Sequence, residues 1–373
     1  MKRYTVISIL LVGLACSGPA EEPSSEALDM TQAMLGRWNV TVVGEDTYPL
    51  WFELTEVNGE LTGSFQPRGG HAIPIDSVEV SGDELTFRVA ETGYTGQSVN
   101  DGLKGNVMLE DASSREWVAV RAPELPPTEN PEWGEPIDLF NGKDLNGWLP
   151  RQPSQTNMWA AEDGVLVNKG KGSDLLTEAT FGDFTLHIEV NCPAESNSGI
   201  YLRGRYEVQV QDDYGKEPNS LYLGGLYGRI TPTENAAKPA GEWQIFDITL
   251  LGRWVTVELN GKRIIDHKEI AGITGGALDS NEGEPGPSCC KVTTARSPTE
   301  IWSSPPSPNR KLSSLGVRPR WSKVCEHPGV TNTLGSGPKG RKNVENFADN
   351  SSFPHFPVRW GLTPSVRLLV FRF

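Results

Sequence analysis

The sequence contains few cysteines and few histidines, with five of each among its 373 residues. Cys16 lies in the N-terminal leader, and Cys192 is the only other cysteine before residue 288. This excludes a framework of disulfides for the main body. Apolar cores must hold it together instead, and the chain is long enough for two. Because Cys192 has no histidine at a useful spacing, we interpret it as a buried small side chain rather than a nucleophile.

Several chemical motifs are also missing. The sequence has no phosphate-binding loop, no Gly-x-Ser-x-Gly elbow, no dinucleotide fingerprint and no Cys-x-x-Cys pair. His187 and His267, the two histidines between residues 133 and 287, have no metal-type partner at short spacing. We therefore predict no cofactor. A divalent cation at Asp212-Asp213 is the alternative, although an acidic pair in a loop is more often simply solvated.

The first residues have the pattern of an export signal. Lys2 and Arg3 precede an apolar run, 6–15, that is too short to span a bilayer as a helix. Cys16 follows directly, which predicts a signal peptide over 1–16 and lipid attachment at Cys16; cleavage near Ala20 is the alternative. Residues 17–33 then form a polar tether. We expect an exported protein, located in the periplasm or, as a lipoprotein, at the outer membrane.

Residues 34–121 predict a small antiparallel β domain. Short alternating segments are separated by tight-turn signals, of which Asn58-Gly59 is the strongest, whereas helical periodicity is confined to 25–35. Leu35-Gly-Arg-Trp38 resembles the opening of lipocalin-type small barrels, and a simple antiparallel meander fits equally well. Four prolines within 122–132 then mark an extended linker.

Residues 133–287 predict a second all-β domain. Apolar and polar residues alternate from Phe184 to Val190, and again in 200–203 and 206–211. Asn260-Gly261 adds another strong hairpin signal. Many short strands with turns between them favour a sandwich. The pattern alone leaves the jelly-roll and immunoglobulin-like strand orders open.

An ordered set of motifs runs through this second domain. It consists of Phe140-Asn-Gly-Lys-Asp-Leu-Asn-Gly-Trp148, Trp159-Ala-Ala-Glu-Asp-Gly164, Asp183-Phe-Thr-Leu-His-Ile-Glu189, Asn197-Ser-Gly-Ile200, Arg203, Tyr206-Glu-Val-Gln209, Gly225-Leu-Tyr-Gly228 and Pro239-Ala-Gly-Glu-Trp243. In this order and at these spacings the motifs resemble the 3-keto-disaccharide hydrolase family. The resemblance implies a concanavalin-like jelly roll over 133–287. It also implies a hydrolase or lyase whose substrate is an oxidised oligosaccharide or glycoside with a ketone at C3.

The chemistry that the resemblance implies begins at that ketone. It acidifies the C2 proton, which a base can remove so that the enolate expels the C1 substituent. We expect Glu207 to be the base, Arg203 to hold the ketone oxygen and Asn197 to orient a hydroxyl. Further substrate-binding candidates are Glu189, Gln209, Tyr201, Trp243 and Glu242. The alternative is a solvated sheet face with cross-strand ion pairs and core positions for the tryptophans.

The composition changes after Pro287. Residues 288–373 carry 13 Lys and Arg against four Asp and Glu, whereas the rest of the chain carries 21 basic and 44 acidic residues. Read one nucleotide earlier, permitted codons for 289–296 yield Met-Leu-Gln-Gly-Asp-His-Gly-Lys, which resembles the last strand of the family. We therefore interpret 288–373 as a disordered, out-of-frame tail. Loss of the closing strand would weaken the sandwich and can leave this chain inactive.

Two other classes of function fit the same sequence. One is a non-catalytic carbohydrate-binding jelly roll at the cell surface, because a fold of this kind can bind sugars without chemistry. The other is a surface interaction module made of two β domains. The acidic body argues against nucleic acid as a partner, and a membrane is expected as a partner only through the lipid on Cys16. Catalysis needs a carboxylate close to an arginine, whereas sugar binding needs only aromatic rings and amides.

Overall fold

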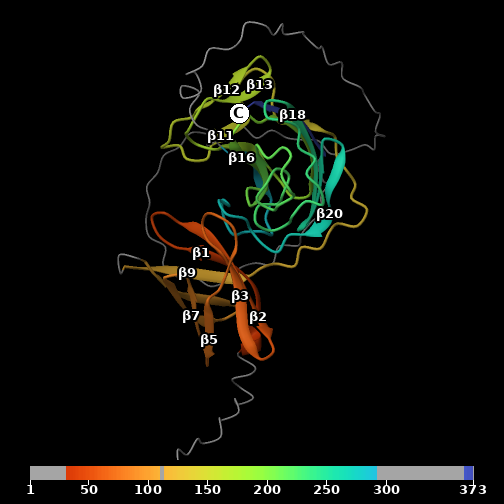
Figure 1. Cartoon of the computed structure of the whole chain (residues 1–373). Coiled ribbons are helices and arrows are strands. Elements are labelled where there is room, and N and C mark those ends of the chain that lie inside the picture. Colours follow the sequence, from red (N-terminus) through yellow and green to blue (C-terminus); the bar gives the residue numbers. More distant parts are fainter. Residues whose placement is uncertain (1–30, 110–112, 292–364, 373) are drawn as a thin grey trace, which may run out of the picture. The chain divides into compact units, whose positions relative to one another are not determined.

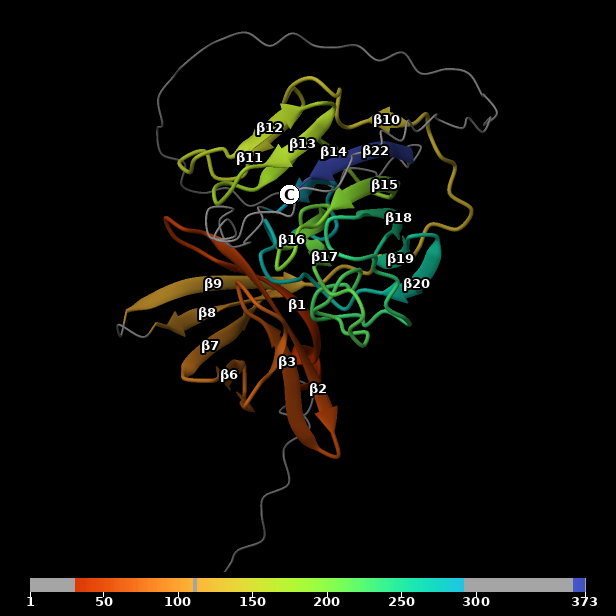
Figure 2. The ribbon, with the colours of Figure 1, turned by 45° about the horizontal axis from the view of Figure 1, so that its top comes forward.

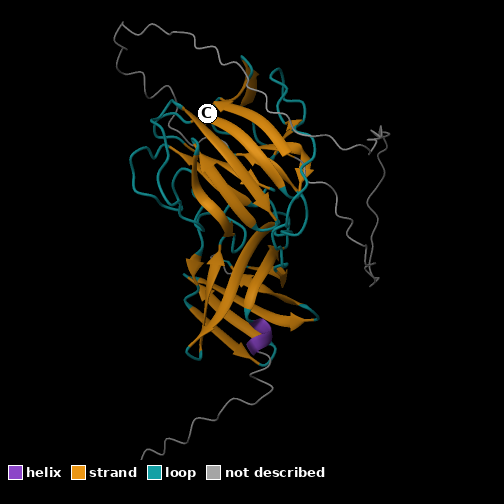
Figure 3. Cartoon of the chain, turned by 90° about the vertical axis from the view of Figure 1, so that its right-hand side faces the viewer, coloured by secondary structure: helices purple, strands orange, loops and turns teal. Residues whose placement is uncertain are grey.

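The computed structural model describes residues 31–109, 113–291 and 365–372 (Figure 1). These residues form strands and connecting loops, with one helical turn at 31–34 (Figure 3). No helix within the described ranges is long and apolar enough to cross a bilayer. The predicted signal peptide, its lipidation site Cys16 and most of the predicted tether lie outside the described residues.

The first domain is one antiparallel sheet of nine strands in the order β4-β3-β2-β1-β9-β8-β7-β6-β5. The strands are β1 (Gly36–Val42), β2 (Tyr48–Val57), β3 (Glu60–Gln66), β4 (Ile73–Pro74), β5 (Ser77–Ser81), β6 (Glu84–Val89), β7 (Thr92–Val99), β8 (Gly102–Met108) and β9 (Ser114–Arg121). The N–H of Ile75 donates to the carbonyl oxygen of Gly63 in β3. The N–H of Asp76 donates to the carbonyl oxygen of Arg88 in β6. The two residues that link β4 to β5 are thus hydrogen-bonded to β3 near one edge of the sheet and to β6 near the other. The meander is thereby closed as a small barrel around an apolar core.

The turn signals of the sequence form the expected hairpins. Asn58 and Gly59 have φ values of 55° and 81° and join β2 to β3. Asn260 and Gly261 have φ values of 54° and 80° and join two strands of the second domain. Positive φ at both central residues is what this tight hairpin requires. These dipeptides therefore fix the strand register locally.

The sequence pattern does not predict β7, which contains two glycines. The ring of Trp117 in β9 accounts for one of them. A Cβ at Gly96 in β7 or at Gly105 in β8 would collide with that ring. Glycine lowers strand propensity, but here it makes room for a fully buried tryptophan.

The second domain is a sandwich of two sheets of the jelly-roll class (Figure 2). The larger sheet has the order β12-β13-β22-β15-β18-β19-β20, with β10 paired to β22, and the smaller has the order β11-β14-β21-β16-β17. The strands are β10 (Ile137–Asp138), β11 (Trp148–Pro150), β12 (Trp159–Glu162), β13 (Val165–Asn168), β14 (Leu175–Phe181), β15 (Phe184–Asn191), β16 (Asn197–Leu202), β17 (Tyr206–Gln211), β18 (Trp243–Leu251), β19 (Trp254–Leu259), β20 (Lys262–Glu269), β21 (Gly286–Cys290) and β22 (Ser365–Arg372). The predicted linker 122–132 contains no strand or helix.

Alternation along the strands fills the space between these two sheets. The four apolar side chains of β15 at positions 184, 186, 188 and 190 are buried in the core, as are Tyr206, Val208 and Val210 of β17. The parity predicted from the sequence is thereby confirmed. The residues between them in β17, Glu207 and Gln209, lie on the outer face of the smaller sheet.

The prediction of a disordered tail over 288–373 is wrong at both of its ends. Residues 288–290 complete β21, which pairs with β14 and β16. Residues 365–372 form β22, which lies parallel to β15 and to β13. Without β22, one edge of β15 would have unpaired N–H and C=O groups, and the backbone of β22 pairs with that edge. Residues 292–364 of the predicted tail lie outside the described residues.

Candidate active site

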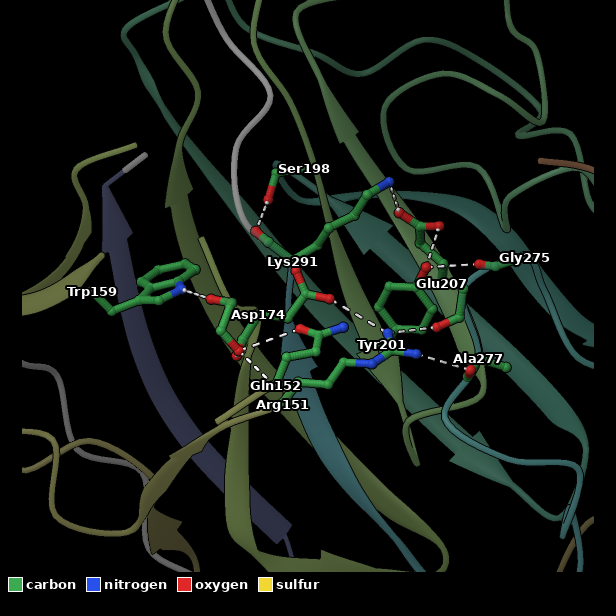
Figure 4. A network of polar contacts seen from close by, with 12 residues as sticks. Arg151, Gln152, Trp159, Asp174, Ser198, Tyr201, Glu207, Gly275, Ala277 and Lys291 are labelled. Carbon is green, nitrogen blue, oxygen red and sulfur yellow. Dashed lines mark hydrogen bonds and ion pairs between the residues drawn. The ribbon is translucent and has the colours of Figure 1, made fainter. Parts of the chain in front are cut away.

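The hairpin of β16 and β17 carries a cluster of polar side chains on the outer face of the smaller sheet (Figure 4). Tyr201 of β16 pairs in register with Glu207 of β17, so their side chains are cross-strand neighbours. Gly199 leaves room for Glu207, because a Cβ at Gly199 would overlap the Glu207 carboxyl group. The motif Asn197-Ser-Gly-Ile200 therefore supplies the space that the carboxyl group occupies.

Glu207 is almost completely buried, with a relative exposure of 1%, and both of its carboxyl oxygens have partners. The hydroxyl of Tyr201 lies 2.8 Å from Oε2, and Nζ of Lys291 donates to Oε1 over 3.0 Å. The same Tyr201 hydroxyl lies 2.7 Å from the carbonyl oxygen of Gly275. Figure 4 shows the tyrosine and the lysine directed toward the carboxyl group.

The Tyr201 hydroxyl links its surroundings to the protonation state of Glu207. It has one hydrogen to donate but two oxygen neighbours at hydrogen-bonding distance. The carbonyl oxygen of Gly275 can only accept, so both bonds form together only when Glu207 is protonated and donates to Tyr201. When Glu207 is ionised, it can take the tyrosine hydrogen itself. The geometry is therefore compatible with either charge state of Glu207.

Burial raises the pKa of Glu207, because surroundings of low polarity disfavour the charged carboxylate. The ammonium group of Lys291 and the hydrogen bond from Tyr201 act in the opposite direction. Burial also raises the pKa of Tyr201, and the neighbouring Glu207 adds to that effect, so the phenol stays neutral. A carboxylate with a raised pKa is a stronger base once it is ionised.

Lys291 directly follows β21 and is fixed through its backbone. Its N–H donates to the carbonyl oxygen of Gly199 over 3.0 Å, and its carbonyl oxygen accepts from Oγ of Ser198 over 2.7 Å. The Lys291 side chain is 29% exposed, whereas that of Glu207 is 1% exposed. Lys291 is thus the more exposed member of this ion pair.

Arg151 holds the loop that carries Gly275. Its guanidinium donates to the carbonyl oxygens of Gly276 over 2.7 Å and Ala277 over 3.0 Å, and it forms an ion pair with Asp174. Gly276 has a φ of +80°, and a Cβ there would overlap the Tyr201 hydroxyl. The loop therefore gives the tyrosine a fixed hydrogen-bond acceptor.

A row of amide side chains continues along the same hairpin. Nδ2 of Asn197 and Nε2 of Gln209 both donate to Oε1 of Gln211, over 2.7 and 3.1 Å. Nε2 of Gln211 donates in turn to Asp213. Because a carboxylate only accepts, Asp213 fixes the direction of the row. Oε1 of Gln209 is buried without a hydrogen-bond partner in the described part of the chain, so the row ends on an open acceptor.

Asp213 has a structural environment rather than that of a metal ligand. Its buried carboxylate accepts from Nζ of Lys216 over 2.6 Å and from the N–H of Leu223. Among residues 31–109, 113–291 and 365–372, no group of three or more His, Cys, Asp or Glu is arranged to hold a metal ion. The cation considered at Asp212-Asp213 gains no support from this geometry.

The structure does not bring Arg203 to Glu207. Arg203 lies in the turn after β16 with a φ of 51°. Its guanidinium donates to the carbonyl oxygen of Gly252 and lies over the ring of Tyr206. Strand alternation ends at such a turn, so parity does not give the direction of this side chain. The cation beside Glu207 is Lys291 instead.

Three further candidates belong to the larger sheet or its approach. Glu189 lies in β15, Trp243 begins β18, and Glu242 is an exposed residue just before it. Nε2 of His187 lies 3.8 Å from Glu189, and its Nδ1 bonds to Asp247 over 2.6 Å. The hydrogen bond to Asp247 raises the pKa of His187. These candidates are therefore grouped apart from the hairpin that carries Asn197, Gln209, Tyr201 and Glu207.

Sequence reasoning missed Lys291 and Arg151. Lys291 falls in the segment interpreted as out of frame, and Arg151 falls just after β11, where no periodic pattern marks it. One signal was available for Lys291. Since Cys290 lies in the core, parity places the residues on either side of it, Cys289 and Lys291, on the outer face.

Comparison with known proteins assigns the second domain a family. Residues 135–292 match the model of a family described as 3-keto-alpha-glucoside-1,2-lyase-like domain. A solved protein of Parabacteroides distasonis, provisionally named a glycosyl hydrolase, is 30% identical over 47% of this chain and 88% of its own, with a TM-score of 0.38. A second such protein from the same organism is 22% identical over 42% and 87%, with a TM-score of 0.34. No curated protein matches the chain.

Proposed function

Because residues 135–292 belong to the family of 3-keto-alpha-glucoside-1,2-lyase-like domains, we propose that this protein cleaves glycosides that carry a ketone at C3. The observation that supports this most directly is the environment of Glu207. A carboxyl group with 1% exposure lies between a neutral phenol and an ammonium group, on the outer face of a sheet. A buried ionisable group with a raised pKa and a specific charged partner is typical of a catalytic site.

In the proposed reaction, Glu207 is the base that removes the C2 proton. The pair of electrons of the C2–H bond moves toward C3, and the ketone oxygen takes the negative charge. When that charge returns, a C1–C2 double bond forms and the C1–O bond breaks. The proton held by Glu207 can pass to the departing oxygen, and addition of water to the double bond completes hydrolysis. The Tyr201 hydroxyl orients Glu207 in both protonation states.

The amide row supplies groups for the hydroxyls of the sugar. Gln209 follows Glu207 by two residues on the same face of β17, about 6–7 Å along the strand. Its unpartnered Oε1 can accept from a hydroxyl group, and Asn197 in the same row can do so through its Oδ1. This site does not include four of the residues suggested by the sequence. Arg203 contacts Gly252 and Tyr206 instead, and the other three, Glu189, Trp243 and Glu242, lie in or next to the larger sheet.

The test offers the purified chain a 3-keto-disaccharide and the parent disaccharide, and measures the release of reducing sugar. We expect release from the keto-sugar only. Glu207→Gln should lower turnover by about two to four powers of ten, because the amide cannot accept the proton. Glu258→Gln, a change in the larger sheet at a carboxylate paired with Arg263, is the matched control. Unchanged turnover in Glu207→Gln would remove Glu207 from the mechanism.

A non-catalytic sugar-binding domain is the second candidate. The closed, ion-paired state of Glu207 favours it, since a substrate must displace part of this pair before Glu207 can react. Calorimetric titration separates the two functions. Binding of a disaccharide without any release of product, equal in the native chain and in Glu207→Gln, would support the binding domain over the enzyme.

A further inference from the structure

The reaction proposed above needs a positive group at the ketone oxygen as well as a base at C2. Arg203, which the sequence suggested for this task, is engaged with Gly252 and Tyr206. Lys291 is the cation that contacts Glu207 in the described part of the chain. Its side chain is also the more exposed member of the ion pair, 29% against 1% for Glu207, so a ligand that approaches the pair meets the lysine first.

The distance within the ion pair fits the geometry of the substrate. The C2 proton and the C3 oxygen belong to adjacent carbon atoms, so the groups that receive them must also be adjacent. A base acts over roughly 2.6–3.2 Å, and an ammonium group donates to a negative oxygen over about 2.7–2.9 Å. Nζ of Lys291 and Oε1 of Glu207 lie 3.0 Å apart, which allows one sugar to contact both.

We propose that Lys291 is a catalytic residue that stabilises the enolate oxygen, an inference that rests on the function proposed above and on residue 291 being in frame as printed. Before the reaction, the ammonium group is paired with ionised Glu207. When the C2–H bond breaks, the proton neutralises Glu207 and the negative charge passes to the oxygen on C3. The ammonium group of Lys291 has three hydrogens to donate, so it can donate a hydrogen bond to that oxygen once the negative charge has moved there. It remains paired with one negative charge throughout, so little reorganisation is needed.

The backbone contacts of Lys291 give this role a fixed starting point. Its N–H donates to the carbonyl oxygen of Gly199, and its carbonyl oxygen accepts from the Ser198 hydroxyl; both residues belong to β16, the strand that also carries Tyr201. Gly199 leaves the space in which the Glu207 carboxyl group lies. One short stretch of β16 therefore positions the phenol, the carboxyl group and the ammonium group together.

The experiment compares Lys291→Met, Lys291→Gln and Lys291→Arg with the native chain. Lys262→Met, which removes an exposed lysine paired with Glu234, is the control. For each variant we would measure kcat and KM on a 3-keto-disaccharide. Exchange of the C2 hydrogen in heavy water would report enolate formation by itself. Thermal melting would show whether the variant is folded.

Lys291→Met and Lys291→Gln should lower kcat by about 100- to 1,000-fold, slow C2 exchange by a similar factor and change KM little. Lys291→Arg, which retains the charge, should keep a larger share of the activity, and added methylammonium should restore part of the activity of Lys291→Met. Unchanged kcat in a folded Lys291→Met, or a loss of kcat with normal C2 exchange, would overturn the assignment. If the native chain neither exchanges nor cleaves any keto-sugar, the proposed function fails first, and the role of Lys291 fails with it.

Discussion

Glu207 is kept in surroundings that oppose its charge, and the residues around it compensate for that. A buried charge that loses its partner destabilises a protein by about 3–5 kcal/mol. Lys291 supplies the partner in the ionised state, and the Tyr201–Gly275 pair accepts the extra hydrogen in the neutral state. When Glu207 is ionised and takes the tyrosine hydrogen, the carbonyl oxygen of Gly275 loses it, but the carboxyl group itself has hydrogen-bond partners in both protonation states. That property suits a base that must return to its starting state in each cycle.

The raised pKa of Glu207 predicts the pH dependence of the enzyme. The base is active when ionised, so kcat/KM should increase as the pH rises through the pKa of Glu207 in the free enzyme. Burial raises that pKa, so the increase should occur above the range of an exposed glutamate, about 4.3. Lys291→Gln removes the charge that lowers the pKa and should move the increase to still higher pH. A pH–rate profile of both proteins checks this, and a rise at the pH of an ordinary glutamate would contradict it.

Gly199 offers a test of position without any change in chemistry. In Gly199→Ala the new Cβ overlaps the carboxyl group of Glu207, which must then move. A misplacement of about 1 Å can cost roughly 100-fold in rate, so we expect a loss of that order with the β-sheet circular dichroism retained. Gly182→Ala is the control, since a Cβ there meets nothing within 4 Å. Equal activity of the two variants would show that Glu207 tolerates displacement or does not act.

At the scale of strands and turns, local signals were sufficient for part of the fold. Asn58-Gly59 and Asn260-Gly261 form the predicted hairpins because few other residues accept their φ values. The inward positions of β15 and β17 follow from alternation alone. β7 was not predicted because it contains Gly96, which is required by the ring of Trp117 two strands away, since a Cβ at position 96 would collide with that ring. Such a cause depends on tertiary packing and leaves no local pattern.

The candidate site was less accessible to sequence reasoning than the strands that carry it. Parity correctly put Glu207 and Gln209 on one face, because both lie inside β17. It failed for Arg203, which lies in a turn, where side-chain direction depends on φ. It could not pair strands from different parts of the chain, so the approach of Lys291 to Glu207, 84 positions apart, required the structure.

Strand β22 allows a test of the larger sheet. Phe371 is paired with Leu166 of β13 on one side and with Val190 of β15 on the other, so its N–H faces a partner strand in either case. Phe371→Pro removes that donor and should destabilise the domain by about 3 kcal/mol or more. Phe371→Val, which keeps the N–H, is the control. Thermal unfolding measures the difference, and identical melting of the two variants would show that β22 adds nothing to the sheet.

On the scale of the whole molecule, the described residues are held by apolar cores without disulfides. Cys192, Cys289 and Cys290 are buried free thiols, in agreement with the expectation drawn from cysteine scarcity. The barrel and the sandwich each enclose a separate apolar cluster. In the sandwich, this leaves two outer faces that carry different polar groups. Glu207 and the amide row belong to the smaller sheet, whereas Glu189, His187 and Asp247 belong to the larger.

The layered arrangement predicts which face of the sandwich meets the substrate. The apolar core lies between the two sheets, so a sugar in contact with Glu207 does not reach Glu189 on the larger sheet. Glu189→Gln and Trp243→Leu should each keep turnover of a 3-keto-disaccharide within about two-fold of the native value, as is usual for changes away from a site. Initial rates at saturating and at low substrate separate kcat from KM. A ten-fold rise in KM in either variant would place part of the substrate on the larger sheet. The amide row would then have to bind another part of the ligand, because its open acceptor at Gln209 lies on the opposite sheet.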